Sequence, residues 1–183
     1  MVTLTRIGSK DVHYNFVEEL LHTAFPEAER RNDDEQRWNA DHEARFHCLL
    51  ATDGQEPVGL LTYWDFDTFI YIEHLATAPY LRGQGIGQEM VCTFFEEHLS
   101  KPVVLEVEVP TDEMSRRRIG FYERCGLHLW ECDYRQPPYR NSDGWLPMYL
   151  MASSGLSKEK DYQHIQNRIH QEVYGMSHLK ERQ

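Results

Sequence analysis

Three glycines spaced two residues apart, in the segment RGQGIG of residues 82–87, are the first candidate for chemistry in this sequence. An apolar segment precedes them and a helical pattern follows. Because the first amides of a helix have no intrahelical partner and carry a partial positive charge, a glycine-rich approach lets a phosphate lie directly on the backbone. A tight turn that only reverses the chain is the alternative. The spacing fits neither the dinucleotide motif G-x-G-x-x-G nor a P-loop, which needs a following Lys-Ser or Lys-Thr.

Histidines and cysteines form no comparable pattern. The segment HEARFH superficially resembles a metalloprotease motif, but His42 and His47 are five residues apart. Two histidines on one helix face need a spacing of four, so no metal site is predicted. The four cysteines contain no C-x-x-C pair and are too few for a disulfide framework, which favours reduced thiols in a cytoplasmic protein.

Hydrophobic periodicity predicts the elements that must position the glycine segment. Helical patterns lie at residues 11–25, 35–42, 86–99, 115–125 and 156–174. In the first helix the apolar face consists of Val12, Phe16, Leu20 and Leu21. Runs rich in aromatic and β-branched residues predict successive antiparallel strands at 45–52, 57–66 and 68–77, and later strands at 102–109, 127–134 and 144–152. We therefore expect an α/β (α+β mixed) fold, a largely antiparallel sheet flanked by helices, with the glycines at the start of one helix.

Composition sets limits on the fold and on the partners. A chain of 183 residues with 40% hydrophobic residues can bury a sizeable core, so we expect a single domain over 1–183, with a core at about 1–153 and a C-terminal helical extension at about 156–176. The formal charge of -11 argues against binding nucleic acid or an anionic membrane surface. No apolar run approaches the roughly 20 residues of a membrane span, and the N-terminal stretch lacks the apolar core of a signal peptide.

The glycine segment resembles the acyl-CoA pyrophosphate loop of the GNAT superfamily of N-acetyltransferases. The pattern of that loop is Arg or Gln, two residues, Gly, one residue, then Gly or Ala, and RGQGIG fits it. The segments HLATAPYLRGQGIG and IGFYERCGL extend the resemblance over about residues 68–129. The resemblance implies the GNAT acyl-CoA N-acyltransferase fold, a mixed sheet splayed between its fourth and fifth strands, here with an extra C-terminal helix.

The same resemblance implies acetyl-CoA as the co-substrate, with its pyrophosphate on the amides of residues 82–87. The family often has Asn and Ala where this chain has Ser115 and Arg118. The Asn contact therefore cannot be carried over, and Ser115 either caps its helix or bonds the pantetheine. The residues expected to contact acetyl-CoA are Leu75, Ala76, Thr77, Arg82, Gly83, Gln84, Gly85, Ile86, Gly87, Ser115, Arg118 and Tyr122.

Two catalytic residues follow from the resemblance. Tyr122, in the family's FYE position, would donate a proton or a hydrogen bond to the coenzyme A sulfur; a buried core tyrosine is the alternative. Glu73, on the strand that enters the glycine segment, is the expected base that deprotonates the acceptor directly or through water, and Glu106 and Glu108 compete for that role. A backbone amide near residues 75–77 would stabilise the oxyanion.

The sequence thus predicts an enzyme that transfers an acetyl group from acetyl-CoA to a primary amine of a small molecule or peptide, by direct attack in a ternary complex. An acyl-CoA-binding sensor or interaction module without turnover is the alternative, and a nucleotide-binding oxidoreductase is a third reading. Thiol release from acetyl-CoA, measured across a panel of amines, distinguishes the enzyme from the binding module. Displacement of acetyl-CoA by NAD tests the oxidoreductase. The apolar stripe of the C-terminal helix, Tyr162, Ile165, Ile169 and Val173, either covers a sheet edge or forms a homodimer contact.

Overall fold

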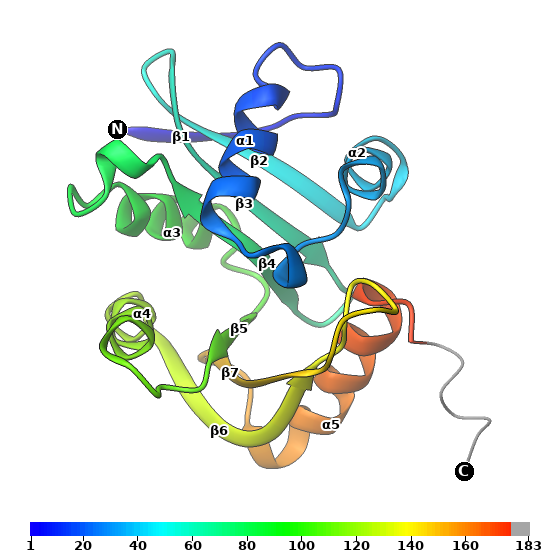
Figure 1. Ribbon diagram of the computed structural model, residues 1–183. Coiled ribbons are helices and arrows are strands. Elements are labelled where there is room, and N and C mark those ends of the chain that lie inside the picture. Colours follow the sequence, from blue (N-terminus) through cyan, green and yellow to red (C-terminus); the bar gives the residue numbers. More distant parts are fainter. Residues whose placement is uncertain (177–183) are drawn as a thin grey trace. The chain divides into compact units, whose positions relative to one another are not determined.

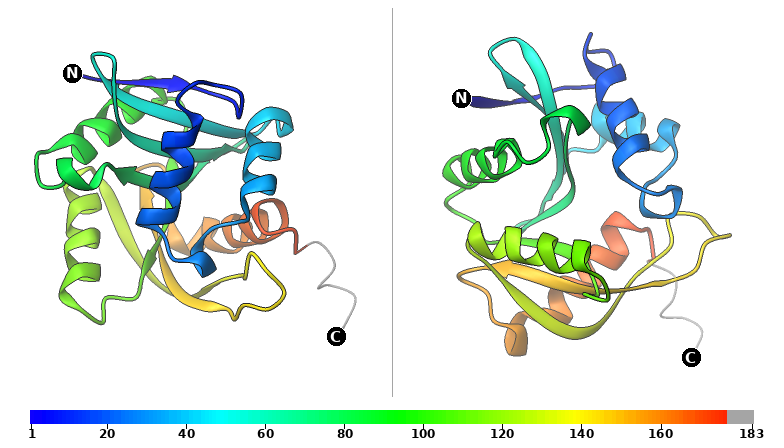
Figure 2. Two further views of the ribbon diagram at one scale, coloured as in Figure 1. Left: turned by 45° about the horizontal axis from the view of Figure 1, so that its top comes forward. Right: turned by 60° about the vertical axis from the view of Figure 1, so that its left-hand side comes forward.

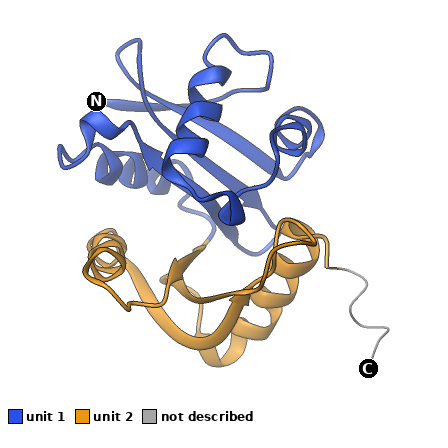
Figure 3. Cartoon of the chain, viewed as in Figure 1, with its two compact units in different colours: residues 1–101 blue, residues 102–183 orange. Residues whose placement is uncertain are grey.

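The computed structural model describes residues 1–176, and the chain divides into two compact units, residues 1–101 and 102–183 (Figure 3). Figure 1 follows the chain through both units. Within residues 1–176, no helix combines the length and the apolar composition that crossing a membrane requires. Each unit contains strands and helices of its own, and the expectation of one domain over the whole chain stays a prediction.

Unit 1 contains an antiparallel sheet whose strands lie side by side in chain order. They are β1 (Val2–Arg6), β2 (Phe46–Asp53), β3 (Glu56–Asp65) and β4 (Ile70–Thr77). The three successive antiparallel strands predicted between residues 45 and 77 are confirmed. The sequence analysis did not predict β1, because a strand of only five residues shows too little alternation to be recognised.

Helices cover both faces of this sheet. The right panel of Figure 2 shows α1 (Tyr14–Ala24) and α2 (Asp33–His42) on one face and α3 (Ile86–Glu97) on the other. Short turns of 3₁₀ helix, Glu27–Glu29 and Pro79–Leu81, precede α2 and α3. The predicted helices are thereby confirmed, each within a few residues.

The apolar face predicted for α1 was wrong in part. Its buried residues are Tyr14, Val17, Leu20 and Leu21. Val12 lies before the helix begins and is 85% exposed, and Phe16 is only partly buried. The helix begins at Tyr14, whose ring is buried and which is the first residue of the buried face. Phe16 therefore lies beside this face and not on it.

A β-bulge interrupts β4 at Glu73. Thr62 of β3 pairs with His74, whereas the next residue, Tyr63, pairs with Ile72. Glu73 is therefore an extra residue on its strand, and such a bulge changes the direction in which the local side chains point.

Gly59 of β3 allows α3 to pack closely on the sheet. A Cβ atom at Gly59 would lie 2.6 Å from the carbonyl oxygen of Ala76 and 2.8 Å from the sulfur of Met90. Met90, Val91 and Phe94 form the buried face of α3. The N-terminus of α3 is thus held against the end of β4, which leads into the glycine segment.

Unit 2 contains β5 (Val103–Glu108), β6 (Leu127–Gln136) and β7 (Leu146–Ser153), with β7 between the other two and antiparallel to both. The helix α4 (Glu113–Arg124) connects β5 to β6, and α5 (Lys158–Arg168) continues into a π-helical turn, Ile169–Val173. These elements confirm the predicted strands and helices of this region. The π turn was not predicted.

The C-terminal helix lies along β6, which is irregular there. From Trp130 to Tyr134, β6 advances four residues while β7 advances two, so β6 bows away from its partner. Carbonyl oxygens in this bow accept hydrogen bonds from α5: that of Glu131 from Lys158 Nζ at 3.2 Å, and that of Asp133 from the Tyr162 hydroxyl at 3.0 Å. Within unit 2 the extension therefore donates hydrogen bonds to two carbonyl oxygens of β6, and coverage of a sheet edge by its apolar stripe stays a prediction. Whether it also forms a homodimer contact stays a prediction.

Candidate active site

The glycine segment forms an open loop at the N-terminus of α3. Gly83 and Gly85 have φ angles of 79° and 85°, in the left-handed region that glycine adopts without strain. A Cβ atom at either position would meet nothing within 4 Å, so the space above the backbone is open. Gly85 is the N-cap of α3, and among the described residues no side chain caps this helix. The first amides of α3 thus face a space where an anion could lie.

The charged and polar side chains around this loop favour an anion. Arg82 is exposed and has no ion pair within residues 1–176. Glu89, the acidic residue in the first turn of α3, accepts a hydrogen bond from the backbone N–H of Val2 at 2.7 Å, so its carboxylate is directed to β1. Gln84 donates its side-chain amide to the carbonyl oxygen of Tyr80 at 3.0 Å, which fixes the loop onto the 3₁₀ turn before it.

The end of β4 leads directly into the loop. Leu75, Ala76 and Thr77 pair with Leu61, Leu60 and Gly59 of β3. Leu75 and Thr77 are partly exposed, whereas Ala76 is buried. The expected acetyl-CoA contacts from Leu75 to Thr77 and from Arg82 to Gly87 therefore form one continuous strand, turn and helix start in unit 1.

The side chain of Glu73 is fully buried and forms an ion pair with Arg31. Its carboxylate has an exposed fraction of 0%, and the Arg31 side chain 4%. Arg31 donates to both carboxylate oxygens, with a distance of 2.9 Å from Nη1 to Oε2, and the indole N–H of Trp64 donates to Oε2 at 3.1 Å. Glu73 as a whole is nevertheless partly exposed, so its exposed atoms belong to the main chain.

Aromatic rings and an amide complete the surroundings of Arg31. Its guanidinium carbon lies 5.5 Å from the ring centre of Phe46 and 5.8 Å from that of Trp64. Nη1 also donates to the side-chain oxygen of Gln36 at 2.8 Å. Arg31 comes from the connection between α1 and α2 and Gln36 from α2, so this ion pair fastens that connection to the bulge in β4.

His74 lies beside this pair and is neutral. Burial lowers its pKa, although the nearby Glu73 carboxylate acts in the opposite direction. One ring nitrogen lies 3.2 Å from the Thr62 hydroxyl, and the other 3.0 Å from the carbonyl oxygen of Glu29. The ring of Phe25 packs edge-on against it at 4.6 Å. His74 is therefore a satisfied core residue that adds a second link to the α1–α2 connection.

Tyr122 in unit 2 remains protonated at neutral pH. It lies on the buried face of α4, and burial raises its pKa to about 12 in spite of the opposing charge of Arg118. Its hydroxyl has no hydrogen-bond partner within the part of the chain that the structure describes. A protonated phenol with an unused donor is the state that a proton donor needs.

Ser115 and Arg118 are engaged within unit 2. The N–H of Ser115 donates to the Asp112 carboxylate at 2.7 Å, and the N–H of Asp112 donates to the Ser115 hydroxyl at 3.2 Å, which is a capping box. Asp112 is thus the N-cap of α4, and Ser115 contributes to the cap from the third helical position, whereas the sequence analysis expected Ser115 itself to cap the helix or to bond the pantetheine. Arg118 Nη1 donates to Glu108 Oε2 at 2.9 Å, and both side chains are about two-fifths exposed, at 42% and 41%.

Sequence reasoning missed several residues next to those it selected. Arg31, a partner of Glu73, lies between the helices predicted at 11–25 and 35–42, and Trp64, the other partner, lies in the strand predicted at 57–66. Tyr134 and Tyr174 both donate to the Glu106 carboxylate, and neither was singled out. No local signal could have found these residues, because each contact joins different elements of the fold: Trp64 lies on the strand next to that of Glu73, and Arg31, Tyr134 and Tyr174 lie 28 to 68 residues from the carboxylates that they contact.

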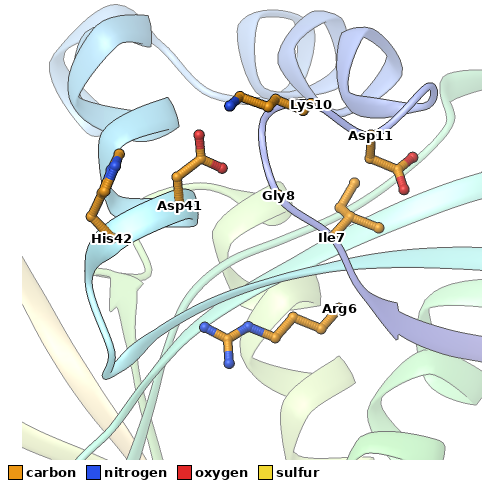
Figure 4. A pocket seen from close by; sticks show the side chains of 7 residues that line it. All are labelled: Arg6, Ile7, Gly8, Lys10, Asp11, Asp41 and His42. Carbon is orange, nitrogen blue, oxygen red and sulfur yellow. The ribbon is translucent and has the colours of Figure 1, made fainter.

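A separate hollow in unit 1 does not contain the expected residues. Its volume is about 550 Å³, and Figure 4 shows the side chains around it, from β1, the loop after β1 and the end of α2. Asp41 accepts hydrogen bonds from the N–H and hydroxyl of Ser9 at 2.7 and 2.5 Å, which lower its pKa. This carboxylate fastens the loop to α2.

Comparisons with known proteins agree with this fold. The model of the acetyltransferase (GNAT) family matches residues 14–127, more than half of the chain. A solved structure from Bacteroides thetaiotaomicron, assigned to the GNAT acetyltransferases, is 47% identical, covers 94% of this chain and 98% of its own, and has a TM-score of 0.91.

Two further relatives are more distant. YjbC of Bacillus subtilis (strain 168), assigned as an acetyltransferase, is 35% identical over 68 residues, which are 36% of this chain and only 34% of YjbC. A GNAT family acetyltransferase from Elizabethkingia anophelis, crystallised with acetyl-CoA bound, covers 83% of this chain and 97% of its own at 16% identity and a TM-score of 0.54, and so shows the fold alone.

The family model and the 47%-identical structure place this α/β fold among the acyltransferases. The chain belongs to the GNAT family of acetyltransferases. The predicted family and fold class, with the helical extension at the C-terminus, are confirmed.

Proposed function

We propose that this protein transfers an acetyl group from acetyl-CoA to a primary amine of a small molecule or peptide. Membership of the GNAT acetyltransferase family supports the reaction class. The acetyl-CoA bound to the relative from Elizabethkingia anophelis supports the donor. A cytoplasmic location is part of the proposal because four cysteines without a C-x-x-C pair are too few for a disulfide framework, and cell fractionation that finds the protein elsewhere would contradict it.

The observation that carries the proposal is the open loop at the start of α3. Its glycines have positive φ angles and leave space above the backbone, and its helix has no side-chain cap among the described residues. A pyrophosphate fits such a loop, because amides without partners and the helix dipole both favour negative charge. Arg82 supplies a full positive charge beside them.

In the proposed reaction the amine nitrogen attacks the thioester carbonyl directly. A nitrogen–carbon bond forms, the carbon–sulfur bond breaks, and the leaving thiolate takes a proton. Tyr122 is our candidate for the donor of that proton, because its raised pKa keeps the phenol protonated. The amine must lose a proton before or during attack.

Direct abstraction of that proton by Glu73 conflicts with the complete burial of its carboxylate. The carboxylate oxygens already accept two hydrogen bonds from Arg31 and one from Trp64. In our proposal Glu73 therefore acts as a positioning residue: its ion pair fixes the bulged main chain of β4, and the proton of the amine leaves to water. Glu106 and Glu108 stay alternatives for the base.

Gly85→Asp tests the loop. A carboxylate placed above these amides would repel the pyrophosphate, so we expect acetyl-CoA to bind at least about tenfold more weakly, which is about 1.4 kcal/mol. Isothermal titration calorimetry with acetyl-CoA measures this. Gly54→Asp is the matched control, because Gly54 also has a positive φ angle, of 62°, and open space at Cβ, but lies in the β2–β3 turn.

Equal binding of acetyl-CoA by the two folded variants would show that the loop is only a turn. Thiol release from acetyl-CoA is then measured with wild-type protein across a panel of primary amines. Binding without release for every amine would refute transfer and leave a binding protein.

A further inference from the structure

One side of α4 carries both the candidate proton donor and a cation. The residues on this side, three or four positions apart, are Ser115, Arg118, Ile119 and Tyr122. Ser115, Ile119 and Tyr122 are buried, whereas the side chain of Arg118 is 42% exposed. Arg118 therefore lies at the edge of the buried face of α4, one helical turn before Tyr122.

The direction of helical side chains brings the phenol towards Arg118. A long side chain on a helix leans back towards the N-terminus and covers the turn that precedes its own Cα atom. We therefore expect the ring of Tyr122 to lie over the turn that contains Arg118. Burial raises the pKa of Tyr122, and the charge of Arg118 acts against this increase. Cys125 is the other titratable group that acts on the phenol.

An ion pair with β5 holds the guanidinium at this edge. Arg118 Nη1 donates to Glu108 Oε2 at 2.9 Å. Glu108 is the last residue of β5 and pairs with Met148 of β7, so its backbone belongs to the regular part of the sheet. A guanidinium has several N–H donors in a fixed plane and spreads its charge over all of them. Binding to one carboxylate oxygen therefore leaves donors of Arg118 for a second group.

The neighbouring Arg117 is placed differently. Its side chain is 78% exposed and pairs with Glu113, four residues earlier on the same helix. A pair of two exposed side chains on one helix contributes little and indicates no site. Arg118, by contrast, forms an ion pair that joins α4 to the sheet.

The proposed reaction leaves a negative charge on the proton donor. When Tyr122 protonates the leaving thiolate, the O–H bond of the phenol breaks, an S–H bond forms, and the phenolate oxygen keeps the electron pair. The phenolate then regains a proton from water. A phenolate in a buried position is unfavourable unless a positive charge lies near it.

We propose that Arg118, held by Glu108, is a positioning residue for Tyr122, and that its guanidinium stabilises the phenolate formed when Tyr122 gives up its proton. The inference rests on the proposed function and names the group that supports its proton donor. Glu108, one of the alternatives for the base, acts here as the anchor of the guanidinium.

The first test measures the phenol itself and needs neither acetyl-CoA nor an amine. The full-length protein is made with 3,5-difluorotyrosine at position 122, because the fluorines lower the pKa of the phenol into a more accessible range. Fluorine NMR follows its ionisation as the pH is raised. Arg118→Ala should move this ionisation to higher pH by at least about 0.5 pH unit, and Arg118→Lys, which keeps the charge, should move it less.

Arg117→Ala is the matched control, because it removes one positive charge from the same helix and breaks only an exposed pair. It should leave the ionisation of the fluorinated phenol unchanged. Circular dichroism and the melting temperature show whether each variant is folded. If Arg118→Ala does not fold, Arg118→Met replaces it, since methionine keeps an apolar stem and lacks the charge.

The second test is a double-mutant cycle on thiol release, with acetyl-CoA and the amine of the panel that reacts fastest. Arg118→Ala should lower kcat about threefold or more when Tyr122 is present, and should hardly change it in Tyr122→Phe, which has no phenol to support. Titration calorimetry measures the Kd of acetyl-CoA in the same proteins. A residue that acts through Tyr122 should leave this Kd within about twofold of the wild-type value.

Three results would overturn the inference. They are equal ionisation of the fluorinated phenol in Arg118→Ala and Arg117→Ala, an unchanged kcat in Arg118→Ala, and a fall in kcat by the same factor with and without the Tyr122 hydroxyl. A weaker Kd with an unchanged kcat would make Arg118 a contact of acetyl-CoA instead.

Failure of the proposed function gives a different pattern. Absence of thiol release from wild-type protein with every amine removes the reaction, and an unchanged kcat in Tyr122→Phe removes the proton donor. The NMR titration is independent of both, because it shows in the protein alone whether Arg118 stabilises the phenolate of residue 122.

Discussion

Glu73 lies on the strand where the sequence analysis placed it, but its surroundings argue against its expected role as the base. Its position before the glycine loop agrees with a base in the resembling family, but a base needs an accessible lone pair. The bulge turns its side chain into the core, where Arg31 and Trp64 occupy it. The residue type and position were predictable from the sequence. Its partners were not, since Arg31 lies 42 residues away along the chain.

Glu73→Gln separates a positioning role from a base. It leaves the Arg31 guanidinium buried without its counter-ion, so we expect the free energy of unfolding to fall by about 3 kcal/mol or more. Urea denaturation measures this. The double variant Arg31→Met with Glu73→Leu should recover most of the loss, because two apolar side chains replace the pair. If Glu73 were also the base, the pH profile of kcat/KM would in addition lose its lower limb, whereas a positioning residue leaves the shape of that profile unchanged.

Tyr122→Phe tests the proton donor. The variant keeps the ring in the core of unit 2 and removes only a hydroxyl that has no partner among the described residues, so the melting temperature should hardly change. If the phenol protonates the thiolate, kcat for thiol release should fall by about 10²-fold or more, while acetyl-CoA binding is kept. Phe121→Leu, on the same helix, is a control for packing. An unaltered kcat in Tyr122→Phe would make Tyr122 a core residue only.

At the scale of elements, the sequence predicted what depends on local periodicity. The alternation of β5 and the stripe of α3 are long enough to be recognised. The sequence analysis named Ser115 as a capping residue but not Asp112, the N-cap that pairs with it. β1 was missed because it is short. The face of α1 was misplaced because the helix begins two residues after Val12.

The two irregularities that matter most for the sites could not be predicted. The bulge at Glu73 and the π turn after Arg168 each insert extra backbone into an otherwise regular element. Both depend on pairing or packing with distant residues, and neither has a glycine or proline to mark it in the sequence. Each nonetheless decides which contact forms: that of Glu73 with Arg31 in unit 1 and that of Tyr174 with Glu106 in unit 2.

At the scale of the whole molecule, buried histidines link stability to pH. Burial lowers the pKa of His47 from its ordinary value of 6.5 to about 4, and burial lowers that of His74 and of His170 as well. Below pH 6.5 the unfolded chain therefore binds protons that the folded chain does not bind. By linkage the free energy of unfolding must fall as the pH drops from about 6.5 towards 4.

The carboxylates continue this trend at lower pH. Hydrogen bonds from His22 lower the pKa of Asp33, and hydrogen bonds from Ser115 lower that of Asp112. A carboxyl group with a lowered pKa in the folded state stabilises the fold above its unfolded pKa and loses that contribution as the pH falls. Acid should therefore destabilise this protein without an intermediate rise in stability.

His47→Gln tests the histidine part of this dependence. The ring of His47 stacks on Tyr63 at 4.5 Å, and Arg6, Asp65, His98 and Lys101 are the charged or titratable groups that act on it. One complete proton difference gives a slope of about 1.4 kcal/mol per pH unit, and part exposure of His47 reduces its share to about 1 or less. Urea midpoints between pH 7.5 and 4.5 should therefore decline less steeply in His47→Gln than in wild-type protein. As a control, His128→Gln, which changes an exposed histidine, should keep the wild-type slope.

Parallel slopes in all three proteins would mean that His47 titrates alike in the folded and unfolded states. The pH dependence of stability would then belong to His74, His170 and the carboxylates.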